Sequence, residues 1–242
     1  LSIVIPVYNE EATLAALFPN FSSYYGSYGY WGYVSFCEND SDWNGNGVPA
    51  VMEAAPLGCI VAETPEGLVA NHIPLLAAEA GMLIGHVALA NDMHRLIADG
   101  QEVLAIFRGE DAYVSPNFYP SKPEHHRHVP TWNYQAVHVY GAISFQHDDH
   151  AKRAAVGLLT RLHERRVNGG RAWRMADAPA DYMEKMLASI VAFRISVHRT
   201  LAKSKLSQNR DERDHQGAVD GLSATGHPGM AERMARRRTA HT

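Results

Sequence analysis

Cysteine is scarce in this chain of 242 residues, which contains only Cys37 and Cys59. Two cysteines are too few for a disulfide framework, and their separation is not that of a metal-binding pair. Cys59 lies in the apolar run LGCIVA, where a thiol behaves as a small hydrophobic group. This usage excludes a disulfide-stapled secreted domain and predicts a reducing, cytoplasmic setting.

A long hydrophobic run is also lacking. No apolar stretch reaches the roughly 18 residues that a membrane-spanning helix needs. No basic segment precedes an apolar one at the start of the sequence, as it would in a signal peptide. We therefore expect no membrane partner. With 46% hydrophobic residues, the chain has enough apolar material for one large core.

An excess of basic residues is absent as well, because the formal net charge is -4. No overall positive field draws the protein onto phosphate backbones, so binding to DNA would need a local basic patch. The dense basic run that stands out is RMARRR, from Arg233 to Arg238. Near the end of a sequence such a run is typical of a solvated tail.

The motifs of several enzyme classes are missing. The sequence has no glycine-rich phosphate loop, no zinc-protease motif and no nucleophile elbow. The run HHRH, from His125 to His128, is rich in imidazole, but neighbouring positions on a loop or strand do not converge on one ion. The sequence therefore predicts no metal site and no catalytic constellation.

The first 47 residues differ from the rest. LSIVIPVYNEE, from Leu1 to Glu11, is typical of a buried strand that leads into a polar turn, and it resembles the first strand of family-2 glycosyltransferases. That resemblance implies a nucleotide-sugar site, for which Asp40 and Asp42 could hold a divalent cation. A turn rich in Asn, Asp and Gly is the favoured alternative. The later sequence does not alternate strands and helices as such an enzyme requires, so residues 1–47 are interpreted as a divergent N-terminal segment.

An orderly pattern of short elements begins at Val48. Residues 49–58 predict a short helix, and residues 59–64, 68–76 and 82–88 predict strands. Residues 91–100 predict a helix capped by Asn91. Two further strands are predicted as a pair at 102–109 and 111–116, and residues 129–146 predict one long strand or two, with Gly141 as a candidate bulge. This pattern predicts an α+β fold, mainly β, in which antiparallel strands form a barrel with flanking helices.

The hydrophobic period changes at Asp148. Apolar residues between about 148 and 187 recur at helical spacing, which predicts a helical insertion. Residues 189–200 return to strand character, and the charged composition after residue 210 predicts a short helix and a tail over 211–242. The predicted organisation is thus an N-terminal segment 1–47, a barrel domain 48–210 that contains the insertion, and a C-terminal segment 211–242.

Three strings, NHIPLL, VPTWNY and KLSQNR, place hydrogen-bonding side chains among apolar ones, a mixture suited to a pocket for a flat ligand with polar edges. In VPTWNY two alternatives stay open: Thr131 and Asn133 line the pocket while Trp132 and Tyr134 pack elsewhere, or the reverse. KLSQNR is dense in donors suited to a phosphate and to the dioxo edge of a ring. With the loop YVSPNFYPSK added, the candidate cofactor-binding residues are Asn71, His72, Ser115, Tyr119, Ser121, Lys122, Thr131, Trp132, Asn133, Lys205, Ser207, Gln208, Asn209 and Arg210.

These strings resemble the PaiB family, FMN-binding negative transcriptional regulators with the split β-barrel of the pyridoxamine-phosphate-oxidase-like proteins, from about Val48 to about Arg236. The resemblance implies FMN as the cofactor and a homodimer that holds the flavin in a cleft between subunits. It also implies negative regulation of transcription, which makes DNA a partner through the family role alone. The alternatives are a flavin- or haem-dependent oxidoreductase on the same barrel and, as a minor one, glycosyl transfer through the N-terminal segment.

Overall fold

The structure, a computed structural model, describes residues 48–78 and 81–239. The segment compared with glycosyltransferases, including Asp40 and Asp42, lies outside the described residues. The described strands are β1 (Leu57–Thr64), β2 (Gly67–Pro74), β3 (Leu76–Ala78), β4 (Met82–Ala88), β5 (Glu102–Val114), β6 (Thr131–Gln146) and β7 (Ile190–Lys205). The described helices are α3 (Val48–Ala54), α4 (Met93–Leu96), α5 (Lys122–His125), α6 (Asp149–Asn168), α7 (Ala180–Ala188), α8 (Glu212–Ala224) and α9 (Pro228–Thr239), with 3-10 turns η1 (Pro116–Phe118), η2 (Gly169–Arg171) and η3 (Met175–Asp177).

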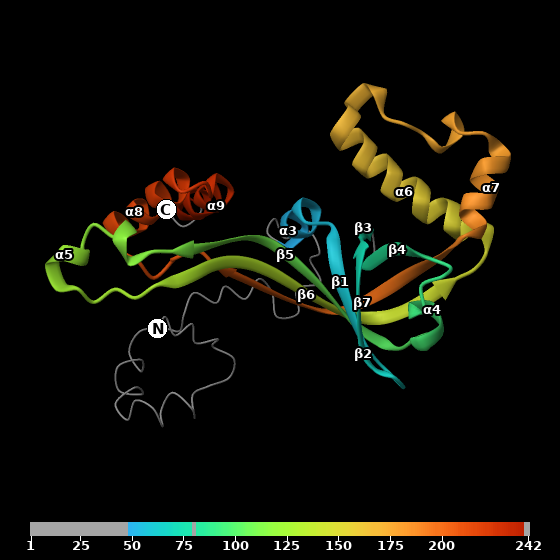
Figure 1. The fold of residues 1–242 in the computed structure, drawn as a ribbon, viewed down its shortest axis with the longest axis horizontal. Coiled ribbons are helices and arrows are strands. Elements are labelled where there is room, and N and C mark those ends of the chain that lie inside the picture. Colours follow the sequence, from blue (N-terminus) through green and yellow to red (C-terminus); the bar gives the residue numbers. More distant parts are fainter. Residues whose placement is uncertain (1–47, 79–80, 240–242) are drawn as a thin grey trace.

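The described strands form one sheet in the order β2-β1-β5-β6-β7-β4-β3, and every neighbouring pair is antiparallel. The two edge strands, β2 and β3, are consecutive in the chain, with Leu75 alone between them. One residue can join the two edges only if the sheet curls around on itself, and β2 does contact β4 (Figure 1). The predicted fold, mainly antiparallel strands in a split barrel with flanking helices, is confirmed.

Leu75 fills the side of the barrel where the two edges meet. Its exposed fraction is 3%. Two glycines leave room for it, since a methyl group on Gly58 would lie 2.8 Å from Cδ1 of Leu75 and one on Gly85 would lie 3.0 Å from Cδ2. The barrel core around it includes Ile60, Leu83, Phe107, Val139, Ile143, Phe193 and Ile195.

Strands β5, β6 and β7 continue beyond the barrel as a long three-stranded extension, with α8 and α9 against one of its faces (Figure 1). A methyl group on Gly217 of α8 would lie 2.3 Å from the carbonyl oxygen of Phe118 in η1, so this helix packs directly against the turn after β5. The extension therefore has a second core of its own. That core consists of Ala112, Val114, Tyr119, Leu206, Ala218, Leu222, Met230, Ala231 and Met234.

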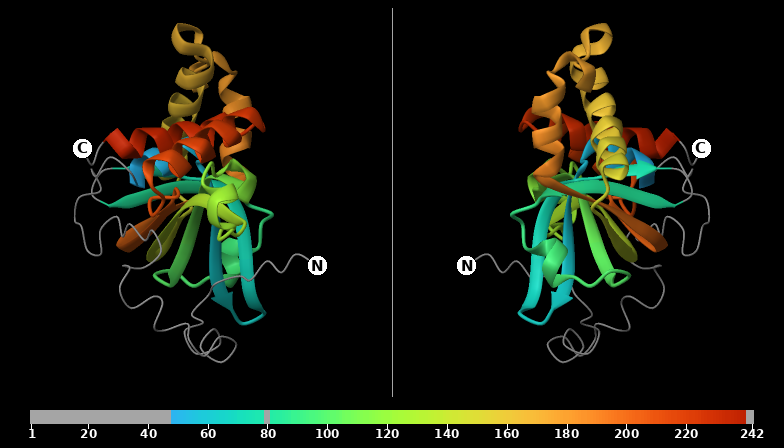
Figure 2. Two further views of the ribbon diagram at one scale, coloured as in Figure 1. Left: turned by 90° about the vertical axis from the view of Figure 1, so that its left-hand side faces the viewer. Right: turned by 90° about the vertical axis from the view of Figure 1, so that its right-hand side faces the viewer.

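Helices α6 and α7 form a hairpin that projects from the barrel (Figures 1 and 2). The side chain of Asp148 caps α6 by accepting a hydrogen bond from the amide of Ala151 at 2.8 Å. Helical spacing predicts an insertion at about 148–187, and α6 and α7 occupy that segment, with α7 ending at Ala188. The buried residues of α6 are Ala151, Lys152, Ala155 and Leu159, so its last nine residues include no buried one.

Some elements differ from those predicted. The segments 102–109 and 111–116 do not form a strand pair, because β5 continues as one strand through a bulge between Arg108 and Asp111 and pairs with β6 on both sides of it. The predicted bulge at Gly141 is confirmed by a register shift between Tyr140 and Gly141. After residue 210 the chain forms two helices, α8 and α9, instead of one helix and a tail. Within 48–78 and 81–239, no helix is both long and apolar enough to cross a membrane.

Candidate functional site

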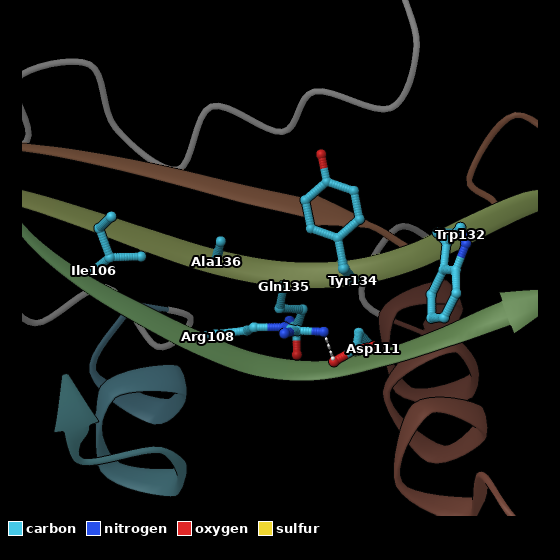
Figure 3. A pocket seen from close by; sticks show the side chains of 7 residues that line it. All are labelled: Ile106, Arg108, Asp111, Trp132, Tyr134, Gln135 and Ala136. Atoms are coloured by element: carbon cyan, nitrogen blue, oxygen red, sulfur yellow. Dashed lines mark hydrogen bonds and ion pairs between the residues drawn. The ribbon is translucent and has the colours of Figure 1, made fainter. Parts of the chain in front are cut away.

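A shallow groove of about 270 Å³ lies along β5 and β6 in the extension (Figure 3). In the close-up, Tyr134 and Gln135 point to opposite sides of β6, as neighbouring side chains on a strand do. The residues that line the groove are Ile106, Arg108, Asp111, Trp132, Tyr134, Gln135 and Ala136.

Strand alternation decides which part of VPTWNY reaches the groove. Trp132 is 45% exposed and Tyr134 is half-buried, whereas Asn133 between them is fully buried. Of the two alternatives for this string, the structure therefore places Trp132 and Tyr134 in the groove. The bulge in β5 brings Arg108 and Asp111 together beside them, with Nη2 of Arg108 donating to Oδ2 of Asp111 at 2.7 Å.

Cations from β7 lie next to these aromatic rings. Lys205 pairs in register with Tyr134, and Nζ of Lys203 lies 5.3 Å from the ring centroid of Tyr134. Nζ of Lys205 donates to Oγ1 of Thr131 at 2.5 Å. Burial lowers the pKa of Lys205, and the charges of Lys203 and Arg210 lower it further. An anion bound here would offset this repulsion, so the electrostatics favour a negatively charged ligand.

Flat aromatic surface is available at the same place. Trp132 and Tyr113 meet edge to face with ring centroids 6.1 Å apart, and both are 45% exposed. Exposed rings of this size are apolar surfaces on which a planar ligand can lie. The groove thus has an aromatic surface that suits the flat ring of a flavin nucleotide and cations that suit its phosphate.

Asn133 and Ser207, two other candidate residues, lie on the opposite side of β6 from the groove. Asn133 is fully buried, and its Nδ2 donates to Oγ of Ser207 at 2.9 Å and to Sδ of Met234 at 3.3 Å. A buried amide needs such partners. In the described structure these side chains connect β6 and the turn after β7 to α9, and their binding of a cofactor stays a prediction.

A buried polar cluster lies at the end of the extension, where the loop after β5 meets α8. Oγ of Ser121 donates to Oδ2 of Asp214 at 2.7 Å, and its amide donates to Oδ1 at 3.0 Å. Nε2 of His128 lies 2.8 Å from Oγ of Ser121 and 3.2 Å from Oδ2 of Asp214. Nδ1 of His128 faces Arg210, whose Nη1 is 3.1 Å away. The guanidinium of Arg210 lies 4.5 Å from the ring centroid of Tyr119.

The Ser121, His128 and Asp214 side chains do not form a nucleophilic triad. In such a triad one imidazole nitrogen faces the hydroxyl and the other faces the carboxylate. Here Nε2 of His128 faces both, and the hydroxyl of Ser121 donates to the carboxylate instead of to the imidazole. Burial raises the pKa of Asp214, but the two hydrogen bonds from Ser121, together with His128 and the charge of Arg210, outweigh it, so the pKa is lowered. The cluster therefore holds the loop to α8 and positions Arg210.

The remaining candidates lie outside the groove. Asn71 accepts a hydrogen bond from Asn91 at 2.9 Å at the barrel end, and His72 is exposed on β2 opposite Cys59. Ser115 caps η1, and Lys122 donates to Asn117. Gln208 braces its own turn through Ser204 and Leu206, whereas Asn209 is exposed. Within one chain the structure therefore brings Thr131 and Lys205 into contact beside Trp132, and it places Arg210 in the buried cluster. Asn71 lies at the barrel end, whereas His72 is in register through Cys59 with Ile106, which lines the groove.

Sequence reasoning missed several residues of this region. Lys203 had a usable signal, because a residue two positions from Lys205 in a strand lies on the same face. Arg108 and Asp111 had none, because their segment is typical of a turn. No local pattern links His128 to Asp214. Within the two described ranges, no group of three or more His, Cys, Asp or Glu residues is placed to hold a metal ion.

A model of the family described as "Putative FMN-binding domain" matches residues 41–199, more than half of the chain. The chain belongs to this family. FMN, the predicted cofactor, is therefore confirmed for this FMN-binding chain. The resemblance to the PaiB proteins is confirmed as well by the curated relative described next.

This member of the FMN-binding family has relatives in bacteria and fungi. It is 32% identical over 183 residues to Protease synthase and sporulation protein PAI 2 of Bacillus subtilis, which covers 73% of this chain and 84% of the relative. It is 32% identical over 176 residues to an uncharacterized protein of Aspergillus fumigatus, over 60% of this chain and 67% of that protein. Among solved structures, the FAD and heme binding protein from Mycobacterium smegmatis matches with a TM-score of 0.47 and 18% identity, over 73% of this chain and 75% of that one.

Proposed function

We propose that FMN binds in the groove on β5 and β6. The family supplies the cofactor, and one observation carries the location: Lys203 and Lys205 lie beside Tyr134 of the groove, next to the exposed ring of Trp132. Lys203, Lys205 and Arg210 would hold the phosphate, and Trp132 and Tyr134 would contact the flat ring. Bound FMN supplies redox chemistry through its isoalloxazine, while these residues bind and orient it.

We further propose that the protein is a homodimer in which a second copy covers the groove. A cofactor pocket usually buries most of its ligand, and a shallow groove on one chain does not. The outer face of the sheet continues from the groove as a row of side chains in register across four strands: Cys59, Ile106, His138 and Leu201. Leu201 is 38% exposed and Trp132 is 45% exposed. Apolar surface of this kind is typical of an interface.

Negative regulation of transcription is the biological role that we propose. Its support is the family resemblance together with the name of the Bacillus subtilis relative, which refers to protease synthase and sporulation. A reducing, cytoplasmic setting fits the low cysteine content and the free thiol of Cys59. Stoichiometric reduction of the bound flavin by a nicotinamide nucleotide would instead favour the flavin-dependent oxidoreductase.

Titration of FMN, followed by quenching of its fluorescence, tests the location. Loss of a hydrogen bond to a charged group costs about 1.5–3 kcal/mol, so Lys205→Ala is expected to weaken FMN binding about 10- to 100-fold. Lys185→Ala on α7, whose side chain is 76% exposed, is the matched control and is expected to bind like the wild type. Equal affinity of all three proteins would contradict the placement of the phosphate.

A further inference from the structure

Positive charge is concentrated at the end of the α6–α7 hairpin, in a protein whose net charge is -4. Residues 161–174, RLHERRVNGGRAWR, form the end of α6 and the loop that follows, and we call them the hairpin tip. The hairpin tip has five arginines and one carboxylate, Glu164. Because the net charge is negative, binding to DNA requires a local basic patch, and the hairpin tip is such a patch.

The single carboxylate of the hairpin tip is used to shape the loop. Oε2 of Glu164 accepts hydrogen bonds from Nδ2 of Asn168 at 2.7 Å and from the amide of Trp173 at 2.9 Å. These hydrogen bonds, that from Trp173 first, lower the pKa of Glu164, so it stays ionised. Gly169, with φ of 54°, turns the chain at the end of α6. The loop is thus held in one shape, with Trp173 41% exposed.

Most of the arginines at the hairpin tip are available to a partner. Arg166 is tied to α3 through the carbonyl oxygen of Glu53 at 2.7 Å, and Arg174 pairs with Asp177 at 2.9 Å. Arg161, Arg165 and Arg171 are exposed and form no ion pair with any residue in the described ranges. Arg161 and Arg165 are one turn apart on α6, about 6 Å along its axis.

The hairpin tip also adds nothing to the core. No residue of α6 after Leu159 is fully buried, and the end of the helix projects away from the sheet (Figure 1). Leu162 and His163 are half-buried there. Val167 is 80% exposed there. A hairpin tip that has no fully buried residue but presents arginines and an exposed tryptophan has the composition of a contact surface for an anionic partner.

We propose that the hairpin tip binds nucleic acid. Arg161, Arg165 and Arg171 would contact phosphates, for which the planar guanidinium is well suited, and Trp173 would stack on an unpaired base. A lipid surface is the weaker fit, because Trp173 and Val167 are the only large exposed apolar side chains at the tip and a membrane-bound helix needs a continuous apolar face. This site is separate from the flavin groove, and it would give the proposed regulatory role a physical means of reaching DNA.

The test is fluorescence anisotropy of a labelled single-stranded DNA oligonucleotide and of its duplex, titrated with the full chain at several salt concentrations. The wild type is expected to bind, most tightly to the single strand. Arg161→Ala/Arg165→Ala/Arg171→Ala is expected to reduce affinity at least tenfold and to reduce the salt slope by about 2. Trp173→Ala is expected to weaken single-strand binding about tenfold while changing duplex binding less.

The matched control is Arg95→Ala/Arg127→Ala/Arg194→Ala, which removes three exposed arginines outside the hairpin tip and is expected to bind within about threefold of the wild type. Circular dichroism confirms folding, and the flavin absorbance of each sample reports FMN binding separately. Three results would overturn the proposal: no binding by the wild type, equal losses in the two triple variants, or binding to phosphatidylglycerol vesicles in place of either oligonucleotide.

Discussion

Nη1 of Arg210 lies 3.1 Å from Nδ1 of His128 and donates a hydrogen bond to it. Because a guanidinium can only donate, Nδ1 of His128 must be the unprotonated nitrogen, and Nε2 carries the hydrogen that points to Ser121 and Asp214. His128 is thus neutral in this arrangement. Burial lowers its pKa, and the charge of Arg210 lowers it further against the opposing charge of Asp214. His125 and Asp211 act on it more weakly, in opposite directions.

Acid is therefore expected to destabilise the protein through His128. Its pKa is lower in the folded state than in the unfolded state, so its contribution is complete above about pH 6.5 and is lost as the pH falls through the lowered folded value. In His128→Gln this loss is removed, and the free energy of unfolding should fall less steeply between about pH 7 and pH 5 than in the wild type. Urea denaturation at each pH measures the difference.

His126→Asn is the control for this experiment, because His126 is exposed two residues away and its backbone, with φ of 54°, suits asparagine. His86 and His138 also have pKa values lowered by burial, and both are unchanged in the two variants. If the free energy of unfolding of His128→Gln falls with pH as steeply as that of the wild type, the assignment of a neutral, buried imidazole to His128 is wrong.

The contact between α8 and η1 predicts that Gly217 does not tolerate a larger side chain. A methyl group at Gly217 would meet the carbonyl oxygen of Phe118 at 2.3 Å and Cδ of Pro120 at 2.5 Å, so backbone must move. Gly217→Ala is expected to lower the free energy of unfolding by about 1–3 kcal/mol despite the better helix propensity of alanine. Gly170→Ala, with nothing within 4 Å of the new methyl group, is expected to be neutral. Equal stability of both variants in urea would rule out this packing.

The buried amide of Asn133 predicts a loss of stability without a direct loss of cofactor. Asn133→Ala leaves the hydroxyl of Ser207 without this partner and opens space under α9, so the free energy of unfolding should fall by about 2–3 kcal/mol. FMN affinity under folding conditions should change by less than about threefold, because the side chain faces away from the groove. A large loss of FMN affinity with unchanged stability would instead place Asn133 at the cofactor.

The proposed interface predicts a change of assembly from one substitution. Leu201→Glu puts a charge into the row formed with Ile106 and His138, and burying that charge against a second copy would be costly. The variant is expected to sediment as a monomer at concentrations where the wild type is a dimer. Val167→Glu changes a residue that is 80% exposed on the hairpin and should leave the dimer intact. If the Leu201→Glu variant still forms dimers, this face of the sheet is not the dimer interface.

Local patterns predict much of the barrel. The hairpin of β1 and β2 follows from two apolar runs around Pro65, Glu66 and Gly67, and the bulge at Gly141 follows from a glycine inside a strand. Strand β3 has only three residues, too few for a periodic signal. For β5 the sequence predicts two strands, because Gly109, Glu110 and Asp111 favour a turn. In the structure, pairing with β6 on both sides of the bulge keeps β5 continuous.

The site is predictable only in part, because its strings are divided between two faces. Lys205 faces the groove, but the chain then turns at Ser207, whose φ is 59°, and that side chain is buried beside Asn133. Nothing local indicates that Ser121 meets Asp214, 93 positions later. The composition of the sequence therefore identifies a segment rich in hydrogen-bond donors. Whether each donor faces the ligand or the protein core depends on long-range packing.

Sedimentation velocity of the FMN-loaded protein, recorded at the visible absorbance band of the flavin, tests most directly that FMN lies in a groove completed by a second copy. The wild type should show the flavin signal on the dimer alone, with one FMN for each chain. Trp132→Ala should lose most of that signal, whereas Trp173→Ala on the hairpin should keep it. Flavin that sediments with a monomer at full occupancy, or that stays on Trp132→Ala as on the wild type, would contradict this site.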